Sequence, residues 1–137
     1  MGRMKCKCGE VMVDTLVPNP FTGSVIADVD SDEFQETIAD ELAALMKVAS
    51  NAELRTAWMN KHFEIPPYPA DASNQELIFD LISQVQNRLS RCLWQCESCG
   101  RLWLQDKPYE NNWRSFDPDD EWKGTSSLES LLIKAET

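Results

Sequence analysis

The chain has 137 residues, a formal net charge of −10 and 42% hydrophobic residues, a globular rather than a disordered composition. No apolar run approaches the roughly 20 residues of a membrane-spanning helix, and the first residues lack the apolar core of a secretory signal. The sequence therefore predicts a single α+β domain, residues 1–137, in the cytoplasm and away from membranes.

The first predicted elements follow two closely spaced cysteines, Cys6 and Cys8, with Gly9 directly behind them. Alternating apolar residues over 10–17 predict a strand that leaves this group and ends at the prolines of 18–20. A second, short strand is expected at 25–29 because its residues are β-branched. Both strands would belong to one small antiparallel sheet that also takes in the second cysteine group.

Residues 30–90 are predicted to form a helical insertion of three helices. Residues 30–33 offer an N-cap oxygen at Asp30 with Glu33 three residues later, and together with an apolar stripe over 31–49 they favour the first helix. Asn51 can cap a shorter second helix that closes near His62. Ser73 with Glu76 forms a capping box that opens the third.

A second cysteine group follows the helices. Residues 92–96 are expected to be a strand that runs into Cys96 and Cys99, which are two residues apart and followed by Gly100. Residues 101–105 would run back out as its partner strand. The remaining segment, 106–137, is aromatic and acidic and ends in a predicted short helix at 126–135.

The spacing of these cysteines points to a metal. Two cysteines across a tight turn with a glycine behind them form half of a tetrahedral thiolate site, so the two groups together predict one Zn²⁺ centre. Residues 4–17 and 91–105 resemble the two halves of a zinc ribbon. The resemblance implies four ligands, Cys6, Cys8, Cys96 and Cys99. The first pair departs from the pattern, because one residue rather than two separates its cysteines.

Several alternatives for the cysteines stay open at this point. They are disulfides, a zinc clip between two chains, and a redox switch in which oxidation ejects the metal. The fifth cysteine, Cys92, is expected to be a buried free thiol on its strand.

Nothing in the sequence predicts catalysis. Four thiolates close the coordination sphere of zinc and leave no position for water. His62 is the sole histidine and is expected to be a surface or helix-end histidine. Catalytic motifs that rely on a serine nucleophile, a metal-binding histidine pair or a phosphate-binding loop are lacking. The sequence therefore predicts a protein that is not an enzyme and has no catalytic residues.

The charge pattern predicts a basic protein partner rather than nucleic acid. An acidic run over 28–41 contains no basic residue. A second acidic stretch lies beside tryptophans that could act as binding hot spots, and it gives the candidate partner-binding residues Asp117, Asp119, Asp120, Glu121, Trp113 and Trp122. In size, charge and cysteine layout the chain is similar to small bacterial zinc-ribbon proteins of unassigned role and to immunity proteins that neutralise toxins.

The alternative function is a zinc-ribbon protein that binds nucleic acid or acts in transcription. It requires a positive surface. The residues that could converge near the zinc to supply one are Arg3, Lys5, Lys7, Arg88, Arg91 and Arg101. The oligomeric state is left open.

Overall fold

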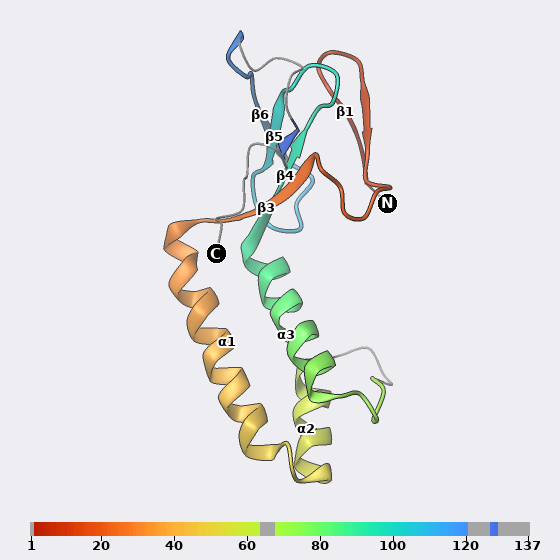
Figure 1. Cartoon of the computed structure of the whole chain (residues 1–137). Helices are drawn as coiled ribbons and strands as arrows, with labels where there is room; N and C mark the ends of the chain where they lie inside the picture. Colours follow the sequence, from red (N-terminus) through yellow and green to blue (C-terminus); the bar gives the residue numbers. More distant parts are fainter. Residues whose placement is uncertain (1, 64–67, 121–126, 129–137) are drawn as a thin grey trace, which may run out of the picture. The chain divides into compact units, whose positions relative to one another are not determined.

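The computed structural model describes residues 2–63, 68–120 and 127–128. Along these residues six strands and three helices follow one another in the order β1, β2, β3, α1, α2, α3, β4, β5, β6 (Figure 1). The predicted α+β class is confirmed. The described residues fall into two compact units, which lie within Met1–Val25 together with Ser90–Thr137, and within Ile26–Leu89.

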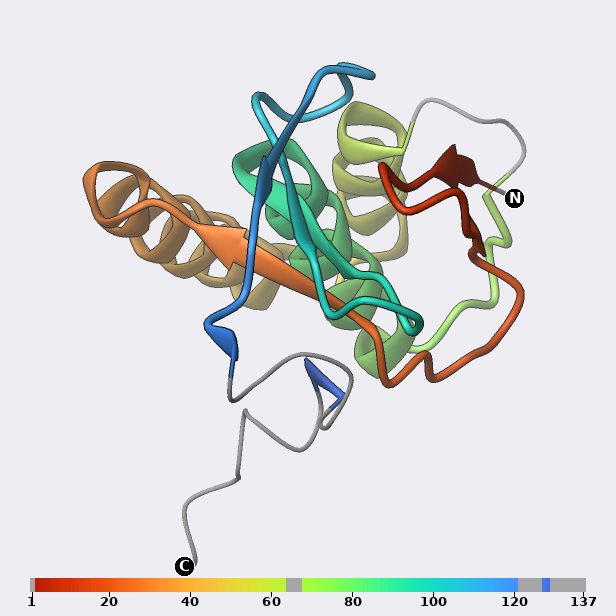
Figure 2. The same cartoon turned by 90° about the horizontal axis from the view of Figure 1, so that it is seen from above.

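The first unit contains two sheets. β1 (Arg3–Lys5) pairs antiparallel with β2 (Val11–Val13), with Met4 opposite Met12. The larger sheet has the strand order β3-β4-β5-β6 (Figure 1 and Figure 2). Its strands are β3 (Thr22–Ile26), β4 (Ser90–Gln95), β5 (Leu102–Gln105) and β6 (Trp113–Phe116). β4 and β5, and β5 and β6, pair antiparallel.

The strands differ from the predictions in three ways. The strand expected over 10–17 ends at Val13, the strand expected at 25–29 lies at Thr22–Ile26, and β1 and β6 were not predicted. Strands of three to five residues carry too little alternation to be recognised, and strand pairing decides their bounds. The prediction of one sheet is also wrong, since the first cysteine group lies in a hairpin with its own two-stranded sheet. The helix predicted at 126–135 lies outside the described residues, apart from 127 and 128.

The second unit consists of α1 (Asp28–Val48), α2 (Ala52–His62) and α3 (Asn74–Leu89). α1 begins before the predicted acidic start, and Ala27 at its N-cap makes no side-chain hydrogen bond. Asp28 and Asp30 lie in the first turn, where the positive end of the helix dipole favours carboxylates. The helix therefore includes Val29, which the sequence placed in a strand.

The predicted caps of α2 and α3 are confirmed, whereas the cap predicted at Asp30 is wrong, because Asp30 lies inside α1. The side chain of Asn51 accepts a hydrogen bond from the backbone N–H of Leu54 at 3.0 Å. The backbone N–H of Ser73 donates to the Glu76 carboxylate at 2.6 Å, and the N–H of Glu76 donates to the Ser73 hydroxyl at 3.2 Å. These reciprocal bonds satisfy donors that have no partner inside the helix.

The helices enclose a core of their own. Its buried members are Leu45, Trp58, Met59, Ala72, Leu77, Leu81 and Val85. His62 lies beside this core rather than on the surface, with its side chain only 11% exposed and its Nε2 2.8 Å from the Glu41 carboxylate. Its ring packs on Trp58, with centroids 4.4 Å apart. Of the two expected places, the surface or a helix end, His62 takes the second, because it is the last residue of α2. None of the described helices has both the length and the apolar character needed to cross a membrane.

Candidate metal centre

Each cysteine pair lies on a tight turn between two strands. In the first turn, which we call the first knuckle (residues 6–9), the N–H of Gly9 donates to the carbonyl of Cys6 at 2.9 Å. In the second knuckle (residues 96–100), the N–H of Gly100 donates to the carbonyl of Cys96 at 2.8 Å. The first knuckle is thus a version of the second that is one residue shorter.

The two glycines are required by the backbone. Gly9 has φ +100° and Gly100 has φ +74°, values that residues with a Cβ rarely adopt. A Cβ at Gly9 would meet no atom within 4 Å. Glycine is therefore required at this position by the positive φ and not by a lack of room for a side chain.

The knuckles bring four sulfurs together. The Sγ atoms of Cys6, Cys8, Cys96 and Cys99 all lie within 4.8 Å of one another, and we call them the sulfur cluster. Two of the distances join the knuckles directly: Cys6 to Cys99 and Cys8 to Cys96, each 3.6 Å. A disulfide would place its sulfurs about 2.05 Å apart, and all five cysteines are free. In a tetrahedron with metal–sulfur bonds of about 2.3 Å, the sulfurs are about 3.8 Å apart. The sulfur cluster can therefore hold a metal ion.

Backbone N–H groups of the knuckles point at the sulfurs. Burial raises the pKa of the Cys6 thiol, but the N–H of Cys8 and side-chain hydrogen bonds from Trp103, Cys99 and Cys8 outweigh it and lower this pKa to about 7. For Cys96, burial raises the pKa to about 12, although the N–H groups of Cys99 and Ser98 act to lower it. For Cys99, burial likewise raises the pKa, although the N–H of Arg101 acts to lower it.

A site that binds a cation through thiolates combines groups that lower the thiol pKa with surroundings that raise it. N–H donors stabilise thiolates, whereas burial and the proximity of other sulfurs oppose four negative charges in one place. A divalent cation removes that repulsion and lets all four thiols ionise. The donor set, the spacing and the N–H groups therefore all fit a bound metal ion.

Trp103 on β5 extends this set of donors. Its indole Nε1–H is buried and has no conventional hydrogen-bond acceptor among the described residues, yet it lies close enough to the Cys6 sulfur to lower its pKa. The Lys7 ammonium lies 6.0 Å from the centre of the Trp103 ring. Both groups place positive charge near the sulfurs, as expected around a thiolate-rich metal site.

Apolar side chains cover one side of the sulfur cluster, at Cys6 and Cys96, whereas Cys8 is exposed and Cys99 is half-buried. Cys6, Met12 and Cys96 form a buried cluster, with exposed fractions of 3%, 8% and 1%. Met4, Trp94 and Trp103 pack against it. The sulfur cluster is thus the centre of the small core of the first unit, and its geometry and that of the surrounding strands depend on each other.

A family model described as "Domain of unknown function (DUF8617)" matches residues 2–120. The chain belongs to this family. The matched range of the DUF8617 domain contains both knuckles and all three helices. No curated protein and no solved structure matches the chain significantly.

Cys92 lies outside the sulfur cluster of this DUF8617 domain, and the prediction that it is buried is wrong. The pairing of β4 with β5 runs from Leu93 to Gln95, so Cys92 lies on β4 one residue before that pairing. Its backbone N–H donates instead to the Gln105 side chain at 3.1 Å. An exposed thiol four residues before the knuckle makes Cys92 a suitable control for experiments on Cys96.

The predicted partner-binding residues are only partly brought together. Asp117 forms an ion pair with Arg101, and Asp119 and Asp120 are exposed. Trp113 lies on β6, packs against Trp94 with ring centroids 5.8 Å apart, and donates its indole N–H to Asn111. The other two candidates, Glu121 and Trp122, lie outside the described residues.

The predicted basic residues do not act as one group either. Arg88 pairs with Glu33 at 3.4 Å, Arg101 pairs with Asp117, and Arg91 donates to the carbonyl of Asp106 at 3.2 Å. Arg3, Lys5 and Lys7 are exposed beside the first knuckle.

Sequence reasoning missed Trp103, Met12 and Met4 as neighbours of the sulfurs. The signal for Trp103 was its position four residues after Cys99, on the strand that leaves the second knuckle. Met4 and Met12 flank the first knuckle symmetrically, and they oppose each other in the β1–β2 pair.

The role of the Trp103 indole N–H can be measured. The change Trp103→Phe keeps an aromatic ring but removes the donor, and we expect it to weaken metal binding about tenfold, as for other groups that support metal ligands. A competition titration with a chromophoric chelator measures the affinity. Trp113→Phe is the matched control, because its indole N–H bonds to Asn111 instead of facing a sulfur. Equal affinities for the two variants would show that the Trp103 donor has no part in metal binding.

Proposed function

We propose that the sulfur cluster binds one structural Zn²⁺ through Cys6, Cys8, Cys96 and Cys99. Soft thiolate donors in a tetrahedral arrangement select zinc, or iron in a comparable site, over harder cations. Four protein ligands leave no coordination position for water, so the ion would stabilise the fold and not catalyse a reaction. The observation that carries this proposal is the convergence of the four sulfurs within 4.8 Å.

The metal itself can be identified directly. We expect protein produced without added metal to contain about one zinc ion per chain by elemental analysis. Replacing zinc with Co²⁺ should produce the visible absorption of a tetrahedral site together with sulfur-to-metal charge-transfer bands. A stoichiometric amount of iron, or a cobalt spectrum with fewer than four sulfur ligands, would contradict the zinc assignment.

We further propose that the protein is a non-enzymatic, acidic interaction module that binds a basic protein partner, in the manner of an immunity protein that neutralises a toxin. The net charge of −10 supports this, because it attracts cationic surfaces over several ångströms and speeds association. Several of its cations are already engaged within the chain: Arg101 with Asp117, Arg114 with Asp106 and Lys107 with Glu110. The excess of carboxylates is therefore available to a partner.

A nucleic-acid-binding or transcription-associated role is the second candidate. The observation that favours it is the exposed group of Arg3, Lys5 and Lys7 beside the first knuckle. Against it, the arginines expected to enlarge this group are bonded elsewhere in the chain. A patch of three cations supplies few phosphate contacts, and the affinity that depends on them falls steeply with salt.

Two measurements separate these functions. In an electrophoretic mobility assay at physiological salt, we expect no tight binding to DNA or RNA. Candidate basic proteins found by affinity capture are then produced recombinantly and titrated calorimetrically with the zinc-loaded protein. Binding to one of them, with inhibition of its activity if it is a nuclease, supports the first proposal. Tight nucleic-acid binding with no purified partner overturns it in favour of the second.

A further inference from the structure

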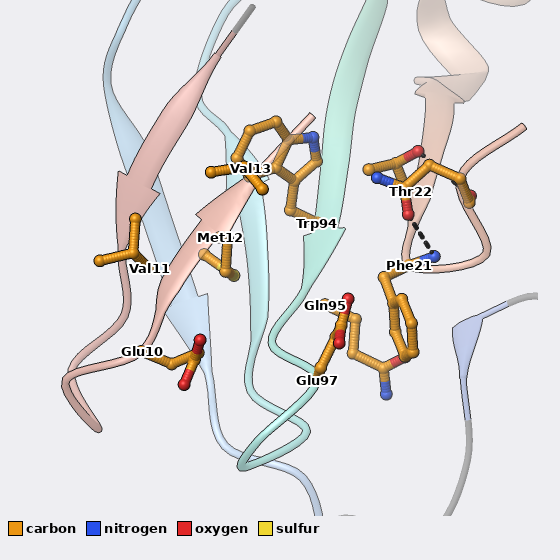
Figure 3. A pocket seen from close by; sticks show the side chains of 10 residues that line it. Glu10, Val11, Met12, Val13, Phe21, Thr22, Trp94, Gln95 and Glu97 are labelled. Atoms are coloured by element: carbon orange, nitrogen blue, oxygen red, sulfur yellow. Dashed lines mark hydrogen bonds between the residues drawn. The ribbon is translucent and has the colours of Figure 1, made fainter. Parts of the chain in front are cut away.

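A small cavity in the first unit adjoins both knuckles, since its lining includes Glu10, which follows the first, and Glu97, which lies in the second. Its volume is about 190 Å³, and β2, the segment around Phe21 and the end of β4 line it (Figure 3). Sites that enclose a whole small molecule usually measure about 300–1,000 Å³, so this cavity has room for a single side chain. Its apolar lining comes mainly from Val11, Met12, Val13 and Trp94.

Two carboxylates lie at one end of the cavity. Glu10 and Glu97 lie on either side of the cavity there, whereas Val13 and Trp94 lie at the other end (Figure 3). Both glutamates are exposed, and among the described residues neither forms an ion pair. The pocket thus combines apolar walls with two carboxylates that make no ion pair within the described part of the chain.

The metal-binding turns position these carboxylates. Glu10 directly follows the first knuckle, and its carbonyl accepts the N–H of Cys6 at 2.8 Å. Glu97 lies inside the second knuckle, between Cys96 and Cys99. The wall residues Met12 and Trp94 belong to the buried cluster around the sulfurs. The same sulfur cluster therefore holds the charged end and part of the apolar wall in place.

We propose that this pocket binds an arginine side chain of a basic protein partner. The three-carbon stem would lie along the apolar wall, and the guanidinium group would lie between Glu10 and Glu97. A planar guanidinium has five N–H donors and can bond two carboxylates at once, which a lysine ammonium does less well. The negative charge excludes phosphate and carboxylate groups. The inference rests on the proposed binding of a basic protein and names one contact of that binding.

The test uses the full, zinc-loaded chain and N-acetyl-arginine methylamide as the probe. Nuclear magnetic resonance titration should show saturable shifts of the Trp94 indole N–H and the Met12 methyl group, at millimolar concentrations of the probe. The citrulline analogue has the same shape without the charge, and we expect it to bind at least about tenfold more weakly. The double variant E10Q/E97Q should weaken arginine binding to a similar extent.

A control separates the pocket from general electrostatics. The double variant E53Q/D71N removes the same charge from exposed positions in the second unit and should bind the arginine probe as the unchanged protein does. Equal binding of citrulline, equal loss in both double variants, or shifts of the pocket signals that depend on protein concentration alone would overturn the proposal. The last result would indicate a second copy of the chain as the occupant.

Failure of this inference differs from failure of the proposed function. If a purified basic partner binds E10Q/E97Q as tightly as the unchanged protein, the pocket is not the contact, although the protein still binds a basic partner. If the arginine probe binds in the pocket but no basic protein binds the chain, the proposed function is wrong and the pocket remains a site for a guanidinium group.

Discussion

Replacing Cys96 with serine should abolish stoichiometric zinc binding and destabilise the first unit. The Cys96 side chain is almost fully buried, 1% exposed, and its sulfur lies 3.6 Å from that of Cys8. A serine hydroxyl is a harder and less acidic donor than a thiol, so we expect the zinc affinity to fall at least about 1,000-fold, or about 4 kcal/mol. Because metal binding is coupled to folding in sites of this kind, the melting temperature should fall together with the affinity.

Elemental analysis and thermal unfolding of the same preparation measure both quantities. Cys92→Ser is the matched control, since it makes the same chemical change four residues earlier, at an exposed sulfur outside the cluster. We expect this variant to keep one zinc ion per chain and its melting temperature. Full zinc occupancy in the Cys96 variant would exclude Cys96 as a ligand, and loss of zinc in both variants would indicate that Cys92 also binds the metal.

The helix caps and the cysteine pairs could be predicted because their chemistry is local. Asn51 and the pair Ser73 and Glu76 bond within three residues along the chain, so a short stretch of sequence contains the whole interaction. The turn at Cys96–Gly100 is equally local. A tetrahedral metal site requires four donors, and each turn supplies only two. The sequence could therefore predict that the two cysteine pairs meet.

The missed features all depend on distant parts of the chain. β6 is a strand because it pairs with β5 across a loop, and its residues Trp113–Phe116 show no strand pattern of their own. Cys92 is exposed although it lies on β4, which the short apolar run around it does not indicate. Trp103 reaches the Cys6 sulfur, and Glu10 and Glu97 line one pocket, only because the two knuckles meet. Local patterns carry no information on such contacts.

The two units differ in what holds each of them together. In the first, the buried apolar residues are chiefly Cys6, Met12 and Cys96, and two of these three are proposed metal ligands. In the second, a larger set of aliphatic and aromatic side chains forms the core. Small domains with few core residues commonly depend on a metal for stability. We therefore infer that zinc stabilises mainly the first unit, whereas packing stabilises the helices.

The complementary change is in the helical core. Leu77 on α3 is completely buried, 0% exposed, and Leu77→Ala should lower the free energy of unfolding of the helical unit by about 2–5 kcal/mol, as for other large-to-small changes in a packed core. None of the four sulfurs belongs to Ile26–Leu89, so this variant should still contain one zinc ion per chain. Denaturant unfolding followed by helical circular dichroism, with elemental analysis of the folded protein, measures the two effects. Leu54→Ala on α2, where the side chain is 51% exposed, should cost far less. Loss of zinc in the Leu77 variant would show that the helical core and the metal centre fold as one cooperative structure.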